Sequence, residues 1–254
     1  DMASACWEVR TKDALCAYCV ENISYELNHI ITYDEAKIYV SYMQSGVSID
    51  EIIRLPYSTD IESVLRQSMQ DSRGNVVILT GKSSLAAEDV ENMAANVYKS
   101  DPMLSPKEPA ASVNMFSGEN MQRLYDIHIN YGEAAKELAA KKEKLAGFDP
   151  FDGVGTEEMS ELDRATLAFE YLTGNCTLCE EGQKNNIYCA VIEKKSDSEG
   201  IALAYVALCK QLGIECRIVY GQYNMENHCW NIIKLGTKYY HVDVSKGISQ
   251  QRWT

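Results

Sequence analysis

A serine, a histidine and an aspartate stand where a nucleophile, a base and an orienting acid could meet. Ser198 opens an apolar run, and His228 and Asp243 lie fifteen residues apart in two strand-like segments. In a catalytic triad the histidine takes the proton of the nucleophile, and the carboxylate holds the imidazole in the correct tautomer. These residue types therefore indicate acyl-transfer or peptidase chemistry, provided that the fold brings them together.

A helix is predicted to position Ser198. Ser196 followed by Glu199 fits a capping box, and Gly213 fits the glycine that ends many helices. Residues 201–209 are apolar on every side, which is typical of a helix buried at the centre of a domain. Serine is also common in the first turn of a capped helix, so its position alone does not require catalysis.

A β-hairpin is predicted to bring His228 and Asp243 together. Segments 228–235 and 238–244 alternate like strands, and Gly236-Thr237 between them suits a type II′ turn. The register that this turn sets places the histidine and the aspartate on one face as diagonal neighbours, about 7–8 Å apart. A base held by its orienting acid is therefore expected beside the start of the helix.

Three motifs around these residues resemble the transglutaminase-like domain, a relative of the papain-like cysteine proteases. The family has Cys-x-Gly-x-Ala at a helix start, then His-Ala-Trp-Asn, then Tyr-x-x-Asp on a strand. The corresponding motifs here are Ser198-Glu199-Gly200-Ile201-Ala202, His228-Cys229-Trp230-Asn231 and Tyr240-His241-Val242-Asp243. The resemblance covers roughly residue 120 to the end. It departs at two places: Ser198 replaces the nucleophilic cysteine, and Val244-Ser245-Lys246 follows the aspartate where Thr-Trp is usual.

The resemblance implies an α+β fold with a papain/transglutaminase-like core. In this core a central buried helix packs on an antiparallel sheet, which here would contain strands over 216–220, 228–235 and 238–244. A small α+β unit that adds no catalytic group is predicted before it. The expected division is an N-terminal unit over 1–105, a Pro- and Ser-rich linker over 106–120, and the transglutaminase-like domain over 121–254. Within the N-terminal unit, 14–31 is predicted as helix and 36–42 as strand.

Whether this domain is an enzyme depends on the serine at position 198. A thiol of pKa about 8.5 is readily ionised by a helix N-terminus and a histidine, whereas a hydroxyl has a much higher pKa. We therefore expect a pseudoenzyme that has lost thiol catalysis and binds a peptide or a cell-surface polymer. The alternative is an active acyl transferase or peptidase that uses Ser198, or a cysteine enzyme in which this residue was changed to serine. Cys229 is a poor substitute nucleophile, because it points away from the face that carries His228.

The charge and hydropathy of the chain exclude some classes of binding partner. The net charge is −13 over 254 residues, which disfavours nucleic acid and anionic membrane surfaces. No apolar run approaches the ~20 residues of a membrane span. The resemblance implies a bacterial protein at the cell surface or outside the cell, and a chain that starts at Asp1 agrees with a removed export signal. The expected partner is a peptide, a protein or a cell-wall polymer, and the oligomeric state stays open.

The cysteines do not indicate a metal centre. There are nine, and four of them form two Cys-x-x-Cys pairs, Cys16/Cys19 and Cys176/Cys179. A four-thiolate zinc site would need both pairs, which are far apart in the sequence. Local disulfides or core thiols are the favoured interpretation. We expect neither a metal nor a cofactor.

Overall fold

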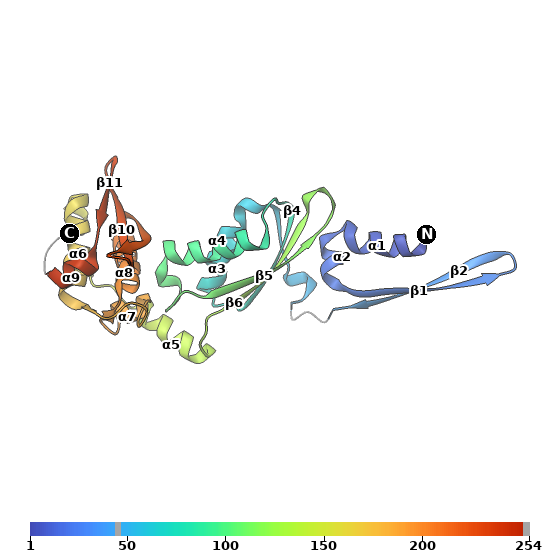
Figure 1. Cartoon of the computed structure of the whole chain (residues 1–254), viewed down its shortest axis with the longest axis horizontal. Coiled ribbons are helices and arrows are strands. Elements are labelled where there is room, and N and C mark those ends of the chain that lie inside the picture. The colour runs from blue at the N-terminus through green and yellow to red at the C-terminus, as the bar shows by residue number, and fades with distance from the viewer. Residues whose placement is uncertain (44–46, 251–254) are drawn as a thin grey trace. The chain divides into compact units, whose positions relative to one another are not determined.

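The computed structural model describes residues 1–43 and 47–250, which form two compact units (Figure 1). The first unit contains residues 1–94 and 111–130. The second contains residues 95–110 and the chain from residue 131 onward. Each unit has helices and strands, so the α+β class expected from the sequence is confirmed.

The unit boundaries differ from the expected ones. Residues 106–120 were expected to be a linker, but strand β5 (Ala110–Ser117) lies within them. Strand β6 (Arg123–Asn130) was expected in the second domain, yet it pairs antiparallel with β4 (Asn75–Lys82) of the first unit. The prolines lie before β5, but Ser112 and Ser117 lie within it, so serine content does not mark a linker here. The chain therefore leaves the first unit before residue 95, returns to it at residue 111, and crosses again after residue 130.

The sheet of the first unit contains β3 (Ile53–Tyr57) as an edge strand and has the order β3-β4-β6-β5, with β3 and β4 parallel. Residues 76–80 of β4 are all buried, which shows that both faces of the central strand are covered. Part of that cover is helix α2 (Ala14–Cys19), whose Ala14 and Tyr18 pack with Val77 and Leu79. The other elements of this region are α1 (Met2–Lys12), β3 (Ile53–Tyr57), α3 (Ile61–Gln70) and α4 (Ala87–Ser100), with 3-10 turns at Ile49–Glu51, Ser58–Asp60 and Glu119–Met121.

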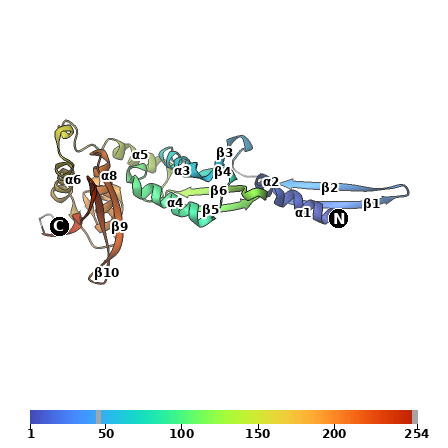
Figure 2. The same ribbon diagram turned by 90° about the horizontal axis from the view of Figure 1, so that it is seen from above.

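A long hairpin follows α2 in the first unit. Helix α2 (Ala14–Cys19) is capped by Asp13, whose side chain accepts the N–H groups of residues 15 and 16. The helix predicted over 14–31 was wrong beyond residue 19, because the chain continues as β1 (Val20–Ile30) and pairs with β2 (Tyr33–Tyr42). Both views show this hairpin extending away from the sheet of its unit (Figures 1 and 2).

Helix α8 (Ser198–Gln211) is the centre of the second unit. Eleven of its fourteen residues are buried, and it contacts two strands and three helices of the unit: β9 (Glu215–Tyr223), β10 (Glu226–Leu235), α6 (Glu161–Asn175), α7 (Ile187–Val191) and α9 (Val244–Gln250). Its C-terminus ends as the sequence predicts: Gly213 has a φ of +70°, and the N–H of Ile214 donates to the carbonyl of Cys209 at 2.8 Å. The predicted central buried helix is therefore confirmed.

The N-terminus of α8 differs in one detail. Its N-cap is Asp197, whose Oδ1 accepts the N–H of Gly200 at 3.1 Å, and not Ser196. Ser196 belongs to the short strand β8 (Lys195–Ser196), and its hydroxyl donates to the carbonyl of Lys184. The capping box read from the sequence was one residue out of place, because serine and aspartate are both good caps.

The sheet of the second unit is antiparallel with the order β11-β10-β9. Its strands are β9 (Glu215–Tyr223), β10 (Glu226–Leu235) and β11 (Lys238–Val242). Leu235 pairs with Lys238, as the Gly236-Thr237 turn predicts, and the ladder continues to the pair Asn231–Val242. It ends there, because helix α9 (Val244–Gln250) begins where the strand was expected to reach residue 244.

The remaining elements of the second unit surround α8 and lead up to it. Helix α6 begins after Ser160, whose hydroxyl caps it by accepting the N–H of Asp163 at 3.1 Å. No described helix is both long and apolar enough to cross a bilayer. The other elements are the 3-10 turns Pro102–Leu104 and Thr156–Glu158, α5 (Ala135–Ala146), α6 (Glu161–Asn175), β7 (Thr177–Leu178) and α7 (Ile187–Val191).

Candidate functional site

Ser198 occupies the first position of α8 and is 1% exposed. Its hydroxyl donates to Oε2 of Glu181 at 2.8 Å and accepts the backbone N–H of Cys229 at 3.1 Å. The second bond ties the start of the helix to strand β10 beside His228. The helix start and the histidine strand are thus adjacent, as the sequence predicts.

Two carboxylates occupy the N-terminal end of α8. Oε1 of Glu181 accepts the backbone N–H of Ser198 at 3.2 Å, and Oε2 accepts the hydroxyl of the same serine. Asp197 accepts the N–H of Gly200 through one oxygen and that of Gly182 through the other, at 3.1 and 2.8 Å. A helix N-terminus stabilises a nearby anion by about 0.3–1 kcal/mol. Here that positive end already faces two negative side chains before any substrate arrives.

Gly200 allows the helix to approach its neighbours closely. A Cβ at this position would lie 2.0 Å from Oγ of Ser196 and 2.8 Å from the backbone oxygen of Asn186. Asn186 caps α7 by accepting the N–H of Cys189 at 3.0 Å, so the approach fixes α7 against the first turn of α8. The glycine of the first motif therefore has a packing role that does not depend on catalysis.

His228 and Asp243 form a direct pair. Nε2 of His228 lies 2.7 Å from Oδ2 of Asp243, and both side chains are 14% exposed. A carboxylate only accepts hydrogen bonds, so the imidazole donates from Nε2 and keeps Nδ1 as its acceptor when it is neutral. The other oxygen of Asp243 accepts from the hydroxyl of Ser245 and the N–H of Lys246, at 2.7 and 3.0 Å. Ser245 and Lys246, which depart from the family pattern, thus still donate hydrogen bonds to the aspartate.

Ser198 is not joined to this pair. Among the described residues, neither its hydroxyl nor the Nδ1 of His228 makes a hydrogen bond to the other. The proton of the hydroxyl is directed to Glu181 instead. The structure therefore brings the three predicted residues into one region and connects two of them.

Cys229 faces the interior, as its place next to His228 on a strand requires. It is 8% exposed, and burial raises the pKa of its thiol to about 12, with further increases from the negative charges of Glu199, Glu181 and Asp197. A hydrogen bond with Ser198 lowers the pKa but does not offset these effects. This thiol is protonated at neutral pH, and thiolate is the nucleophilic form of cysteine.

Four aromatic rings form a continuous row on the β11-β10-β9 sheet, on the face opposite the one to which Cys229 points. Their centroids are 6.0 Å apart from Tyr223 to His228, 6.1 Å from His228 to Trp230, and 6.3 Å from Trp230 to His241. The indole N–H donates to Nδ1 of His241 at 2.8 Å, which fixes the position of both rings. A Cβ at Gly221 would lie 2.5 Å from the indole ring, so the absence of a side chain there lets Trp230 lie over β9.

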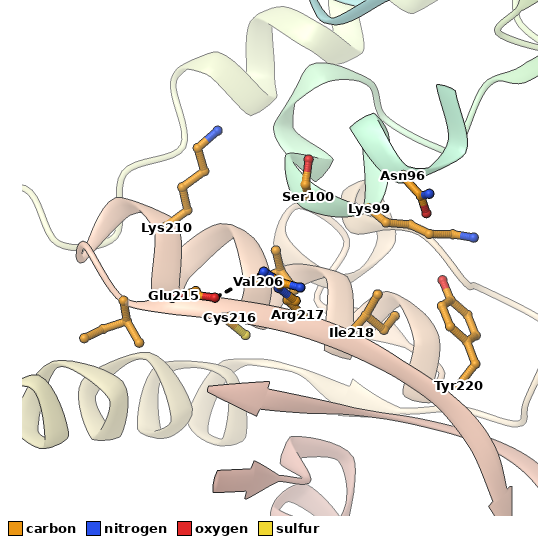
Figure 3. Close-up of a pocket in the computed structure, with 11 residues that line it drawn as sticks. Asn96, Lys99, Ser100, Val206, Lys210, Glu215, Cys216, Arg217, Ile218 and Tyr220 are labelled. Carbon is orange, nitrogen blue, oxygen red and sulfur yellow. Dashed lines mark hydrogen bonds and ion pairs between the residues drawn. The ribbon is translucent and has the colours of Figure 1, made fainter. Parts of the chain in front are cut away.

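A groove of about 720 Å³ runs along β9 in the second unit (Figure 3). Figure 3 shows Tyr220 beside Lys99 at one end and Lys210 toward the other, with Lys99 Nζ 4.9 Å from the centre of the tyrosine ring. Burial, followed by the charges of Glu199 and Glu108, raises the pKa of Tyr220. β9 is the edge strand of its sheet, so the groove lies beside a strand edge that faces no other described strand.

The cysteines form no metal centre in the described part of the chain, and all nine are free thiols. The two Cys-x-x-Cys pairs belong to different units. Burial raises the pKa of Cys176 to about 11, and Cys16, Cys19 and Cys179 are also shifted upward, mainly by burial. These thiols are therefore poorly ionised at neutral pH.

Glu181 is the residue that the sequence analysis missed. It lies in the loop between β7 and α7, seventeen residues before Ser198. Two bonds fold this loop onto the start of α8: the N–H of Cys179 donates to the carbonyl of Ser196 at 2.9 Å, and that of Gly182 donates to Asp197. No local sequence pattern signals this closure, so a carboxylate in this position became evident only in three dimensions.

Comparison with known proteins places the similarity in the second unit. Residues 152–244 match the family model described as the transglutaminase-like superfamily. No curated protein matches the chain.

Two solved structures share low similarity with the chain. One is described as the crystal structure of a TGase, with a TM-score of 0.33 and 10% identity over 82% of this chain and 61% of that one. This chain thus spans less than two thirds of its length. The other is a putative cysteine protease from Cytophaga hutchinsonii, with a TM-score of 0.35 and 10% identity over 58% of this chain and 68% of that one.

Proposed function

Because residues 152–244 form a transglutaminase-like domain, we propose that this domain has lost thiol catalysis and now binds a peptide or a cell-surface polymer. The observation that carries this proposal is the pair Glu181–Ser198 at the start of α8. A family enzyme needs an anion at this position, first as thiolate and then as the oxyanion of the intermediate. Here the position holds a neutral hydroxyl next to a carboxylate.

Repulsion supports the loss of catalysis. A negative charge that develops near Ser198 would lie close to the carboxylates of Glu181 and Asp197. At 4 Å two unit charges repel by about 4 kcal/mol when the effective dielectric constant is about 20. Tenfold in rate corresponds to about 1.4 kcal/mol, so repulsion of this size slows attack by orders of magnitude.

Two surfaces near the former site support binding. The aromatic row from Tyr223 to His241 offers flat rings that contact apolar faces of a ligand. The groove beside β9 offers a strand edge, to which an extended peptide can add by backbone hydrogen bonds. The aromatic row includes residues of the family motifs, the groove lies along the neighbouring strand β9, and neither surface needs a nucleophile.

The proposed location is the cell surface or the extracellular space of a bacterium. It follows from the resemblance alone, as does the choice of a peptide, a protein or a cell-wall polymer as partner. The negative net charge of −13 agrees with a partner other than nucleic acid.

An acyl transferase or peptidase that uses Ser198 is the second candidate. The pair His228–Asp243 favours it, since the imidazole is oriented as a general base with Nδ1 available. For this reaction the hydroxyl would have to turn from Glu181 to His228 before attack.

A trapping experiment separates the two candidates. The protein is mixed with p-nitrophenyl acetate, an activated acyl ester, and its intact mass and tryptic peptides are measured, with Ser198→Ala as the control. We expect the same slow, non-specific acetylation in both proteins. A rapid burst with the acetyl group on Ser198, absent from the control, would establish catalysis and contradict the proposal.

Binding is tested separately with solubilised cell-wall fragments and with an extended peptide library. Trp230 lies in the aromatic row, so ligand contact should change its fluorescence, and Trp230→Phe should remove most of that change. A domain that neither forms an acyl adduct nor binds either class of polymer would be outside both candidates.

A further inference from the structure

Two of the thiols lie against each other where helix α8 ends and strand β9 begins. Cys209 is in the last turn of the helix and is fully buried, and Cys216 is the second residue of the strand. Their side chains are in hydrogen-bonding contact. Both belong to the hydrophobic cluster around α8, in which Cys216 is a partly buried member. Two thiols in direct contact are already close to the arrangement of a disulfide.

The turn between α8 and β9 brings these thiols together. Gly213, with a φ of +70°, reverses the chain, and the N–H of Ile214 donates to the carbonyl of Cys209 at 2.8 Å. Cys216 follows two residues later on a strand that contacts α8. Its partner on β10 is Ile233, which is buried in the cluster that contains α8. The side chain of Cys216 is therefore directed toward the helix that carries Cys209.

The two thiols differ in their access to solvent. Cys216 lines the groove of about 720 Å³ beside β9, and Figure 3 shows it among the other lining residues. Cys209 does not line the groove and lies in the core. A small molecule that enters the groove can thus meet Cys216 first. Oxidation-sensitive cysteines commonly combine one accessible thiol with a second thiol that resolves the first product.

We propose that Cys209 and Cys216 form a reversible disulfide when the protein meets a small-molecule disulfide such as oxidised glutathione. The thiolate of Cys216 attacks one sulfur of oxidised glutathione, forms a mixed disulfide and releases a glutathione thiolate. The thiolate of Cys209 then attacks the sulfur of Cys216 and releases the second glutathione thiolate. The two cysteines lose two electrons and two protons in total, and oxidised glutathione takes them up to become two molecules of reduced glutathione.

The surroundings of the pair favour the oxidised form. Burial, followed by the contact with Cys209, raises the pKa of Cys216, and a hydrogen bond with Asn231 lowers it without offsetting the rise. A disulfide is easily reduced when the protein stabilises the thiolate that reduction produces. Here the thiolate is disfavoured, so the disulfide should resist reduction by glutathione once it has formed. Such a bond suits the oxidising surroundings outside a cell.

The Cys-x-x-Cys pair of the same unit is not equivalent. Cys176 has an extended backbone, with φ −112° and ψ 142°, and strand β7 separates it from Cys179. Three extended residues place their Cα atoms about 10 Å apart. A disulfide needs a separation below about 7 Å, so this pair cannot close without moving the backbone. Cys176 therefore serves as a buried control thiol.

Peptide mapping tests the proposed bond directly. The reduced protein is incubated with oxidised glutathione, remaining thiols are blocked with iodoacetamide, and tryptic peptides are compared before and after dithiothreitol. Trypsin cleaves after Lys195, Lys210 and Arg217, so each cysteine of the pair lies in a peptide without other cysteines. We expect peptide 196–210 joined to peptide 211–217, and separation of the two on reduction. A second arm refolds the protein from urea in a glutathione buffer, so access through the groove does not limit the reaction.

Thermal unfolding gives an independent readout. A disulfide across residues 209–216 restrains the unfolded chain, so the oxidised protein should melt about 5–10 °C above the reduced one. Cys216→Ala should abolish both the joined peptides and this difference. Cys176→Ala, which removes another buried thiol of the same unit, should keep both. Circular dichroism checks that each variant is folded.

Three results would overturn the proposal. Absence of the joined peptides in both arms would show that the backbone holds the two sulfurs apart. Glutathione that stays attached to Cys216 in the wild type would show that Cys209 cannot reach the mixed disulfide. A joined pair that lowers the melting temperature would show that closure distorts the turn after α8.

Discussion

The carboxylate of Glu181 lies 2.8 Å from the hydroxyl of Ser198 and 3.2 Å from its backbone N–H. One negative side chain thus takes both hydrogen-bond donors of the residue that stands at the nucleophile position. Sequence motifs describe the residues that a catalytic site needs, whereas a carboxylate at this distance opposes negative charge on Ser198. It also determines the outcome of restoring the family's cysteine.

Restoring the cysteine should not by itself restore a reactive thiol. From the motifs alone, Ser198→Cys would be expected to react with iodoacetamide near pH 6, helped by the helix N-terminus and His228. Glu181 opposes a thiolate at this position, so we expect the new thiol to titrate above the free value of about 8.5. Adding Glu181→Gln should lower that pKa and speed the reaction at neutral pH by about tenfold or more.

The double variant has its own control. A further His228→Ala change should remove most of the gained reactivity, because the imidazolium is the remaining partner of the thiolate. Labelled sites must be identified by peptide mapping, since nine native thiols are present. Rapid labelling of Ser198→Cys near pH 6 without the Glu181 change would show that the carboxylate does not control the site.

Gly200 and Gly174 should respond in opposite ways to alanine. A Cβ at Gly200 would lie 2.0 Å from Oγ of Ser196 and 2.8 Å from a backbone oxygen, whereas a Cβ at Gly174, in helix α6, meets nothing within 4 Å. Gly200→Ala should therefore reduce the free energy of unfolding by about 1–3 kcal/mol. Gly174→Ala should raise it by about 0.5–1 kcal/mol through helix propensity. Urea unfolding measures both, and a stabilising Gly200→Ala would contradict the close approach of α7.

Asp243 should contribute to stability whether or not the domain is an enzyme. Its carboxylate accepts from His228, Ser245 and the N–H of Lys246. Asp243→Ala leaves these donors without their partner, which should cost about 2–3 kcal/mol, while Ser245→Ala should cost about 1 kcal/mol or less. Chemical denaturation gives both values. Equal and negligible losses would mean that these hydrogen bonds do not hold the site.

The buried thiol of Cys229 should make the protein unstable at alkaline pH. Its pKa is raised from 9.0 in the unfolded chain to about 12 in the fold. The folded state therefore keeps a proton that the unfolded state loses, so this contribution is complete below pH 9 and declines as the pH rises toward 12. The expected decline is about 1.4 kcal/mol per pH unit for the group. Thermal melts of the wild type and Cys229→Ala between pH 8 and about 10.5 should show a shallower slope for the variant.

A matched control for that experiment is Cys6→Ala. Cys6 lies on α1, which buries none of its residues, so this change should leave the alkaline slope close to that of the wild type. A Cys229→Ala variant with the full wild-type slope would show that other groups govern alkaline unfolding, such as Cys176, whose pKa burial raises to about 11.

The sequence was most informative where local geometry determines the outcome. The glycine turn at 236 and the alternation on either side predicted the pairing of Leu235 with Lys238, and this register carries His228 to Asp243. The apolar run from residue 201 predicted burial of α8 in the same way. Both signals depend on the residues of the element itself, so no distant contact was needed.

The sequence was least informative where distant segments decide. Glu181 reaches Ser198 through closure of a loop, and β5 was mistaken for a linker because its partner β6 lies beyond a turn. The strand β1 was mistaken for helix, since only its pairing with β2 reveals which of its residues share a face. In each case the outcome depended on contact with a distant segment, which the conformational preferences of the local residues do not reveal.

The double role of Asp243 has a consequence for reading ancestry from motifs. It orients His228, and it also precedes helix α9, whose third N–H it accepts through Oδ1. The aspartate therefore stabilises the start of α9 independently of any catalytic role. Gly200 likewise has a structural role, since the start of α7 packs against it. Two residues of the family motifs thus hold this domain together whatever Ser198 does, so their presence alone does not indicate catalysis.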